Sequence, residues 1–262
     1  MALMLLAIDI GNTNITLGVF DGERLVATAR VAMEPGRMAD EYGLTLNQIL
    51  PAKGVAVEQV DAVAMCSVVP PLTPTFSQLC ADHFGVEPLV VGAGVRTGVR
   101  VLYDNPRDVG SDRIADAAAA FPLHGGPVIV VDFGTATVFD AISAEGDYAG
   151  GAIAPGITVA ADSLFHSTSQ LRRVELVRPD NAIGNNTVHS LQSGLVLGYA
   201  ELVKGMVRRF KEELRGEAPG NKARVVATGG LAELIQAETG VFDEVDPDLT
   251  LTGLRIIHEL NQ

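Results

Sequence analysis

Cysteine and patterns of metal ligands are scarce in this 262-residue sequence. The two cysteines, Cys66 and Cys80, lie in apolar surroundings with no second ligand motif beside them. We therefore expect two reduced, partly buried thiols rather than a disulfide or a metal site. None of the five histidines has a neighbour at a spacing typical of metal ligands, so each is expected to pack or to face solvent.

Positive charge is also scarce. The chain has 19 Lys and Arg residues against 32 Asp and Glu residues, which gives a net charge of −13. Nucleic acids and anionic membranes bind basic surfaces, so this balance argues against both as partners. The densest basic stretch, residues 208–211, is followed by Glu212 and Glu213 and is typical of a solvated helix face.

Long apolar runs are absent as well, because no stretch approaches the length that spans a bilayer. The apolar residues 1–8 lack a basic leader and meet Asp9. They therefore predict a buried strand rather than a signal peptide, and we expect a cytoplasmic protein. No G-x-x-x-x-G-K-[ST] motif occurs, which excludes a P-loop nucleotidase.

The sequence does supply material for a core, since 47% of its residues are hydrophobic. Residues 3–10 form an apolar run that leads into the turn-prone residues 11–14. The alternating residues 15–20 and the stretch 25–31 complete a predicted three-stranded meander. The pattern then predicts a helix at 40–50, a buried strand at 60–69, a helix at 72–84 and a short strand at 88–91.

The second half of the sequence repeats the first. Residues 127–133 are another apolar run, followed by a Gly-Thr turn and a β-rich stretch from Val138 toward Ala152. Asp9-Ile10-Gly11 and Asp132-Phe133-Gly134 each open a hairpin after a buried strand, so we infer an internal duplication. The inferred lobes are residues 1–121 and 122–262. Further predicted elements are a long helical stretch at 188–214, a strand at 224–228, a helix from Leu231 and a helix at 251–260.

The two Asp-x-Gly turns are suited to binding phosphate. Glycine allows close approach of the backbone, so that successive amides point at phosphate oxygens. Asp9 is a candidate Mg²⁺ ligand, directly or through water, because hard cations prefer carboxylate oxygen. The neighbouring neutral donors are Thr13, Asn14, Thr16, Thr135 and Thr137. Two such turns in duplicated lobes can hold a polyphosphate from both sides.

Three short strings resemble those of a known superfamily. DIGNTN (9–14), DFGTAT (132–137) and ATGG (227–230) resemble the two phosphate motifs and the adenosine motif of the actin, sugar-kinase and chaperone ATPases. Within that superfamily, YDNPRDVGSDR (103–113) followed by DFGTAT resembles type III pantothenate kinases, and the similarity runs through nearly the whole chain. The family commonly has Ala where Ser111 stands here.

The resemblance implies an α/β fold of two duplicated ribonuclease H-like lobes, each a mixed five-stranded sheet with helices, and a nucleotide cleft between the lobes. It also implies transfer of the ATP γ-phosphoryl group to the primary hydroxyl of pantothenate, the first step of coenzyme A synthesis. The implied cofactors are ATP, Mg²⁺ and an activating monovalent cation, K⁺ or NH₄⁺. The implied nucleotide-binding residues are Asp9, Gly11, Asn12, Thr13, Asn14, Thr16, Thr135, Gly229 and Gly230. The implied pantothenate-binding residues are Tyr103, Gly110, Ser111, Asp112, Arg113 and Thr187.

By the same resemblance Asp112 is the catalytic base. An alcohol is a poor nucleophile, so a carboxylate must orient it and accept its proton. Arg113 is suited to a carboxylate or phosphoryl oxygen by its planar fork. Spacing alone offers a plainer interpretation, with Ser111 as a helix N-cap and Asp112 as a first-turn acid. The preceding YDNP string favours the catalytic role.

Other site residues also have plainer interpretations. By resemblance Asp132 binds the monovalent cation, yet it could instead cap its turn or bind Mg²⁺ through water. By resemblance Gly229 and Gly230 let the backbone pass close to the adenosine, yet they could simply form a strand-to-helix turn. Thr187 is a possible helix N-cap. In the family this residue reaches pantothenate from the neighbouring subunit, which implies a homodimer with a shared active site, and the helical stretch 188–214 is a candidate interface.

Two alternative functions stay open at this point. One is a phosphate-chain hydrolase on the same fold, which would use water as the acceptor. The other is a non-catalytic accessory or regulatory relative that has lost the base or a phosphate turn. The joint presence of Asp9, Asp112, Asp132 and Thr187 favours an active kinase.

Overall fold

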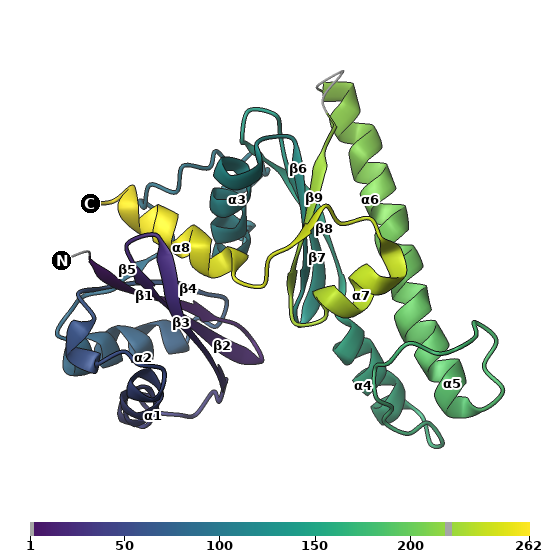
Figure 1. The fold of residues 1–262 in the computed structure, drawn as a ribbon, viewed down its shortest axis with the longest axis horizontal. Helices are drawn as coiled ribbons and strands as arrows, with labels where there is room; N and C mark the ends of the chain where they lie inside the picture. Colours follow the sequence, from purple (N-terminus) through teal and green to yellow (C-terminus); the bar gives the residue numbers. More distant parts are fainter. Residues whose placement is uncertain (1–2, 218–221) are drawn as a thin grey trace. The chain divides into compact units, whose positions relative to one another are not determined.

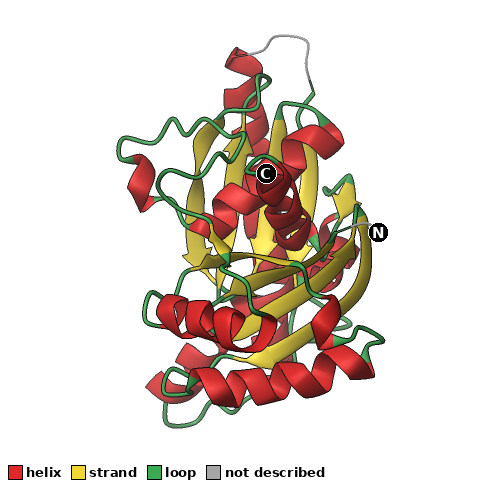
Figure 2. Cartoon of the chain, turned by 90° about the vertical axis from the view of Figure 1, so that its left-hand side faces the viewer, coloured by secondary structure: helices red, strands yellow, loops and turns green. Residues whose placement is uncertain are grey.

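A computed structural model describes residues 3–217 and 222–262, and the chain divides into two compact units. The first unit holds the chain up to Val99, Asp104–Ala119 and the residues from Asp248 onward. The second holds Arg100–Tyr103 and Ala120–Pro247. Each unit is built on one five-stranded mixed sheet, and Figure 2 shows helices flanking the strands.

The first sheet has the strand order β3-β2-β1-β4-β5. Its first three strands form the predicted antiparallel meander, and β4 and β5 add in parallel beside β1. The strands are β1 (Met4–Ile10), β2 (Asn14–Asp21), β3 (Arg24–Ala32), β4 (Ala62–Ser67) and β5 (Leu89–Val90). The helices of this unit are α1 (Ala39–Ala52), α2 (Leu72–Leu79) with the π-helical turn η2 (Cys80–Phe84), α8 (Leu249–Glu259), and most of α3 (Ser111–His124).

Both faces of the first sheet are covered, which explains why β1 reads as a continuous apolar run. One face packs against α1 and α2, where Tyr42, Leu46 and Leu50 recur at helical spacing. The opposite face packs against α3 and α8 (Figure 1). Gly253 of α8 lies so close to the backbone of Ala115 that a side chain there would overlap it.

The second sheet repeats the topology of the first, with the order β10-β9-β6-β7-β8. Again three strands form an antiparallel meander and two strands add in parallel. The strands are β6 (Val128–Phe133), β7 (Ala136–Ile142), β8 (Tyr148–Pro155), β9 (Arg224–Gly229) and β10 (Glu244–Val245). The helices are α4 (Ile157–Ser167), α5 (Thr187–Gln192), the π-helical turn η4 (Ser193–Leu197), α6 (Gly198–Glu217) and α7 (Ala232–Thr239). This correspondence confirms the duplication inferred from the sequence.

The core of the second unit lies between its sheet and the helices α6 and α7, where Val203 and Val207 of α6 are buried in one cluster with residues of β6 and β9. Two elements of this unit were not predicted, namely α4 and the two-residue β10. None of the helices within the described ranges combines the length and the apolar character needed to cross a membrane.

Apart from residues 120 and 121 at the boundary, the units differ from the predicted lobes in two places. Residues 248–262, assigned from the sequence to the second lobe, belong to the first unit because α8 buries Leu251, Leu254 and Ile257 against the first sheet. Residues 100–103, assigned to the first lobe, belong to the second unit. The helix α3 spans the transition at Ala119–Ala120, close to the predicted boundary.

Candidate active site

The first Asp-x-Gly turn follows β1. Asp9 is the only polar residue of that strand, and it is partly exposed, whereas residues 5–8 before it are buried. The register pairs Asp9 with Thr16 of β2 on one side and with Cys66 of β4 on the other. The turn closes where the Gly11 N–H donates to the Asn14 carbonyl oxygen at 3.0 Å. It leaves Asn12, Thr13 and Asn14 exposed, as a phosphate-binding turn requires.

The Asp9 carboxyl group has an unusual environment. Burial raises its pKa to about 7, and the negative charge of Asp112 adds to this effect. Two contacts oppose the rise, the Cys66 thiol, which donates to Asp9 Oδ1 at 3.3 Å, and the positive charge of Arg30. Burial and the adjacent Asp9 raise the pKa of the Cys66 thiol well above its usual range, so it stays protonated. Cys66 is therefore reduced and buried, as predicted, and it is also a hydrogen-bond donor to the first turn.

Asp112 lies in the first turn of α3, in the same unit. Burial raises its pKa, while the Arg113 N–H, which donates to Asp112 Oδ1 at 2.8 Å, and the charge of Arg113 oppose the rise. A side chain at Gly110 would collide with Asp112 Oδ1, so glycine keeps room for this carboxylate. Arg113 is almost fully buried. A raised pKa makes a carboxylate a stronger base, which suits the predicted role of Asp112.

Ser111 makes contacts other than those of a helix cap. Its hydroxyl donates to the Ser67 carbonyl oxygen and accepts from the Ser67 N–H, both at 3.1 Å. Since Ser67 ends β4 and pairs with Ile10 of β1, this link fixes the start of α3 beside the strand ends. The structure thus brings Ser111 and Asp112 to the same end of the first sheet as Asp9, and the N-cap interpretation of Ser111 was wrong.

The second Asp-x-Gly turn repeats the first. Asp132 of β6 pairs with Thr228 of β9, and the Gly134 N–H donates to the Ala136 carbonyl oxygen at 3.0 Å. Thr135 is exposed in this turn, whereas the Thr137 hydroxyl, predicted as a donor, is buried.

Two glycines flank the Asp132 carboxylate. A Cβ on Gly134 would lie 3.4 Å from Asp132 Oδ2, and one on Gly229 would lie 2.5 Å from Oδ1. Gly229 also has a φ of 88°, which other residues rarely adopt. It leads through exposed Gly230 toward α7, one residue later than the predicted helix start at Leu231. Close approach to Asp132 therefore explains Gly229 more directly than a plain turn does.

The remaining predicted residues also lie in the second unit. Tyr103 stands beside Tyr148 of β8, with ring centroids 6.1 Å apart. Thr187 is exposed and is the first residue of α5. It is not the N-cap, because Asn186 holds that position and accepts from the His189 N–H at 2.9 Å. Tyr103 and Thr187 thus belong to a different unit from Asp9 and Asp112.

Comparison with known proteins decides the family. The profile of the family "Type III pantothenate kinase" matches residues 5–209. The chain is 54% identical over 259 residues to type III pantothenate kinase 2 of Symbiobacterium thermophilum, covering 99% of this chain and 97% of the relative. It is 54% identical to the type III pantothenate kinase of a Roseiflexus species, covering 99% and 100%. This chain belongs to the type III pantothenate kinase family.

Solved structures agree with the fold of this type III pantothenate kinase family member. One similar structure is the activator of 2-hydroxyisocaproyl-CoA dehydratase from Clostridium difficile, with a TM-score of 0.51 and 12% identity, covering 99% and 96% of the two chains. Another is the ethanolamine utilization protein EutJ from Carboxydothermus hydrogenoformans, with a TM-score of 0.55 and 16% identity, covering 98% and 90%. At these identities the likeness shows the fold alone, which is the predicted actin-like ATPase fold.

Two contributors to the family member's site were not predicted from its sequence. The Cys66 thiol contacts Asp9 because β1 and β4 are parallel neighbours, and nothing in the sequence near Cys66 signals that pairing. Gly156, which precedes α4, donates its N–H to the Thr135 carbonyl oxygen at 3.0 Å and has no room for a side chain against the second turn. The contact of Gly156 could have been predicted only if the helix α4 that follows it had been predicted as well.

Proposed function

We propose that this protein transfers the γ-phosphoryl group of ATP to the primary hydroxyl of pantothenate, which gives 4'-phosphopantothenate in the first step of coenzyme A synthesis. The observation that carries the proposal is the pair Asp9 and Asp112 in the first unit. They lie close enough for the charge of Asp112 to raise the pKa of Asp9, one in a phosphate-type turn and one in the family's substrate string. Such perturbed acids mark functional sites.

The proposed chemistry is proton removal from the alcohol during phosphoryl transfer. Asp112 accepts the hydroxyl proton as the O–H bond breaks and the new bond forms between that oxygen and the γ-phosphorus. The bond from the γ-phosphorus to the bridging oxygen breaks, and ADP leaves with the electron pair. Because phosphoryl transfer has a loose transition state, most of the catalysis comes from positioning and charge neutralisation. The Arg113 guanidinium is suited to neutralise a phosphoryl oxygen or the pantothenate carboxylate.

The two Asp-x-Gly turns are the proposed phosphate-binding elements. Amides of the first turn, with Thr13 and Asn14, are the proposed phosphate ligands from the first unit, and Thr135 in the second turn is the proposed phosphate ligand from the second unit. Gly229 and Gly230 then line the adenosine. In this proposal Gly110, Ser111 and Tyr103 complete the pantothenate site.

The residues present fit the two cations that the family implies. Asp9 and Asp112 repel each other when both are ionised, and carboxylate oxygens are the ligands that Mg²⁺ prefers. Mg²⁺ held at Asp9 would neutralise charge on the ATP phosphates. Asp132 supplies carboxylate oxygens for K⁺ or NH₄⁺, and Gly134 and Gly229, which approach them closely, carry no side chain that would exclude a cation. Among the described residues no three His, Cys, Asp or Glu side chains form a metal-binding group.

We also propose a homodimer with a shared site, in which Thr187 reaches the pantothenate of the neighbouring subunit. Its exposure at the start of α5 supports this. Mixing inactive Thr187→Ala and Asp112→Asn proteins at equal amounts tests the idea. If subunits exchange, half of the dimers are mixed and each has one intact site, so activity returns to about one quarter of wild type. No recovery, after subunit exchange has been verified, contradicts the shared site.

The proposed substrates also place the enzyme in the cytoplasm, where ATP is available.

The direct test is a product assay with ATP, pantothenate, Mg²⁺ and K⁺. Equal amounts of ADP and phosphopantothenate, identified by mass spectrometry, support the proposal. ADP and inorganic phosphate without phosphopantothenate would instead indicate a hydrolase. A pantothenate analogue without the primary hydroxyl is the control, and it should give no phosphorylated product.

A further inference from the structure

A four-residue segment of the chain joins the second unit although its neighbours on both sides belong to the first. This segment is Arg100–Tyr103, and it pairs with the start of β8. The Tyr148 N–H donates to the Arg100 carbonyl oxygen, and the Leu102 N–H donates to the Tyr148 carbonyl oxygen, both at 2.9 Å. The segment therefore pairs in parallel with the edge of the second sheet through one bridge, and its last residue, Tyr103, opens the string proposed to bind pantothenate.

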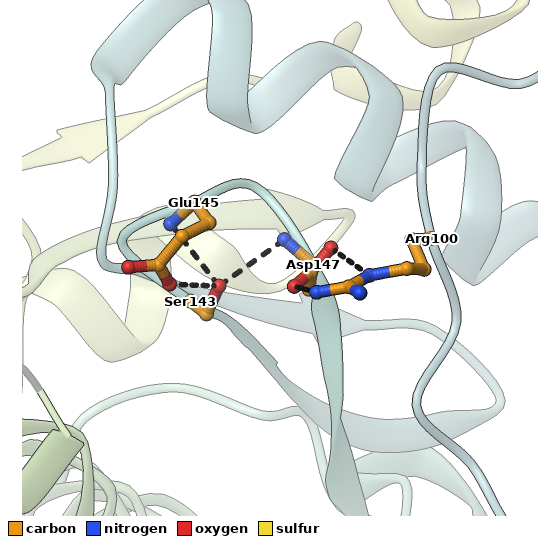
Figure 3. A network of polar contacts seen from close by, with 4 residues as sticks. All are labelled: Arg100, Ser143, Glu145 and Asp147. Carbon is orange, nitrogen blue, oxygen red and sulfur yellow. Dashed lines mark hydrogen bonds and ion pairs between the residues drawn. The ribbon is translucent and has the colours of Figure 1, made fainter.

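An ion pair anchors the first residue of this segment (Figure 3). Arg100 Nε donates to Asp147 Oδ1 at 2.8 Å, and its Nη2 donates to Oδ2, so the guanidinium grips the carboxylate with two hydrogen bonds. Asp147 is held in the β7–β8 turn by hydrogen bonds to Ser143. The Ser143 hydroxyl accepts from the N–H groups of Glu145 and Asp147 at 3.1 and 3.2 Å and donates to the Glu145 carboxylate at 3.0 Å.

The last residue of the segment, Tyr103, packs against Tyr148 and Gly150 of β8. Its ring lies tilted beside that of Tyr148, with centroids 6.1 Å apart, and a Cβ on Gly150 would be 3.8 Å from Tyr103 Cε2, in van der Waals contact. Tyr148 is itself fully buried, and its hydroxyl donates to the Asp140 carboxylate at 2.7 Å. The position of the Tyr103 ring thus depends on how firmly the segment is held along β8.

We propose that the Arg100–Asp147 ion pair is a positioning device for substrate binding, which holds residues 100–103 on β8 so that Tyr103 is set for pantothenate. This inference rests on the proposed function, in which Tyr103 lines the pantothenate site. Arg100 touches no substrate in this account and acts through Tyr103. The pair should therefore affect the KM for pantothenate and leave kcat and the KM for ATP nearly unchanged, which a merely structural ion pair would not do selectively.

The test measures these three constants for wild type and Arg100→Ala. The Arg100 side chain is 72% exposed, so a bidentate pair of this kind is expected to change the pantothenate KM by about three- to fivefold. The matched control is Arg24→Ala, which removes another exposed Arg–Asp pair, Arg24–Asp21 at 3.5 Å in the β2–β3 turn. It should leave all three constants within about twofold of wild type. Asp147→Asn should reproduce the effect of Arg100→Ala.

Two double variants separate positioning from loss of folding. Charge reversal with Arg100→Asp and Asp147→Arg together should restore most of the pantothenate affinity that Arg100→Asp alone removes. In a Tyr103→Leu background, Arg100→Ala should add nothing to the pantothenate KM, because the ring through which it acts is gone.

The outcomes distinguish this inference from the proposed function. An Arg100→Ala enzyme with unchanged pantothenate KM, or one whose effect adds fully to that of Tyr103→Leu, overturns the positioning role while the kinase activity stands. A wild-type protein that forms no phosphopantothenate overturns the proposed function, and this inference with it.

Discussion

The raised pKa of Asp9 makes the stability of the protein depend on pH in a direction opposite to that of most surface acids. The folded protein holds a proton on Asp9 up to about pH 7, whereas an unfolded chain releases it near 3.8. Between these values the folded state binds one proton more than the unfolded state, so the free energy of unfolding falls as the pH rises. The contribution is fully present below about pH 4 and is lost above about pH 7. Asp9→Asn removes this dependence because the amide does not ionise.

The size of the effect follows from the same two values. The window from 3.8 to about 7 covers roughly three pH units, and each unit corresponds to about 1.4 kcal/mol. The upper limit is therefore about 4 kcal/mol, and partial exposure of Asp9 lowers the expected value to about 2–3 kcal/mol. At pH 8 without Mg²⁺, Asp9→Asn should thus be more stable than wild type by that amount, and at pH 4 the two should be nearly equal.

Urea unfolding at pH 4, 6 and 8 measures this difference. The chain has no tryptophan, so far-UV circular dichroism is the suitable signal. Glu23→Gln is the control, because it removes an exposed carboxyl group from the β2–β3 turn of the same unit. An Asp9→Asn protein whose stability changes with pH as steeply as that of wild type would contradict the raised pKa of Asp9. Added Mg²⁺ should stabilise wild type at pH 8 and leave Asp9→Asn nearly unchanged.

Three further predictions concern the second turn, the second core and the cation. Gly229→Ala forces a Cβ into a left-handed backbone position against Asp132. We therefore expect the free energy of unfolding, measured by thermal denaturation, to fall by at least about 1–2 kcal/mol, and ATP to bind more weakly. The control Gly36→Ala meets open space and should change neither quantity. Tyr148→Phe removes the 2.7 Å hydrogen bond to the buried Asp140 and should cost about 1–3 kcal/mol in urea unfolding; an unchanged midpoint would contradict this. Chelation of divalent cations should abolish phosphorylation, and added Mg²⁺ should restore it; full activity in excess chelator would refute the role of the cation.

The antiparallel part of both sheets was predictable because each half of the chain opens with the same pattern of a buried strand, an Asp-x-Gly turn and alternating strands. A hairpin turn specifies an antiparallel neighbour locally, so the meanders β1–β3 and β6–β8 need no distant information. The repeated pattern also predicted that Asp9 and Asp132 lie at equivalent turns. The parallel neighbours of their strands could not be predicted, because parallel pairing joins β1 to β4 across more than fifty residues.

The packing of α8 shows what periodicity leaves open. The spacing of Leu251, Leu254 and Ile257 predicts a helix with one apolar face, and α8 has that face. The spacing does not say which of two similar sheets the face covers, and the helix packs on the first sheet. The contact of Gly253 with Ala115 makes the choice specific, and it is a tertiary contact that no local pattern contains.

The residue that caps each helix N-terminus also depends on contacts that the sequence pattern does not contain. Ser111 and Thr187 are both types that favour N-caps, yet Ser111 bonds to Ser67 of β4 and Asn186 caps α5. The helix α4 escaped prediction because it opens with the β-branched residues Ile157, Thr158 and Val159, which favour helix weakly. It is nevertheless the element whose preceding glycine lies against the second turn.

The most direct test of the account is the turnover of Asp112→Asn with saturating ATP and pantothenate. If Asp112 is the base, kcat falls by about 10²- to 10⁴-fold while ATP binding, measured by titration, stays near that of wild type. Asp116→Asn, one helical turn away, should keep kcat within about threefold, because its carboxyl group accepts a hydrogen bond from Thr250 at 2.6 Å rather than serving as base. An Asp112→Asn enzyme that phosphorylates pantothenate at the wild-type rate would contradict the account.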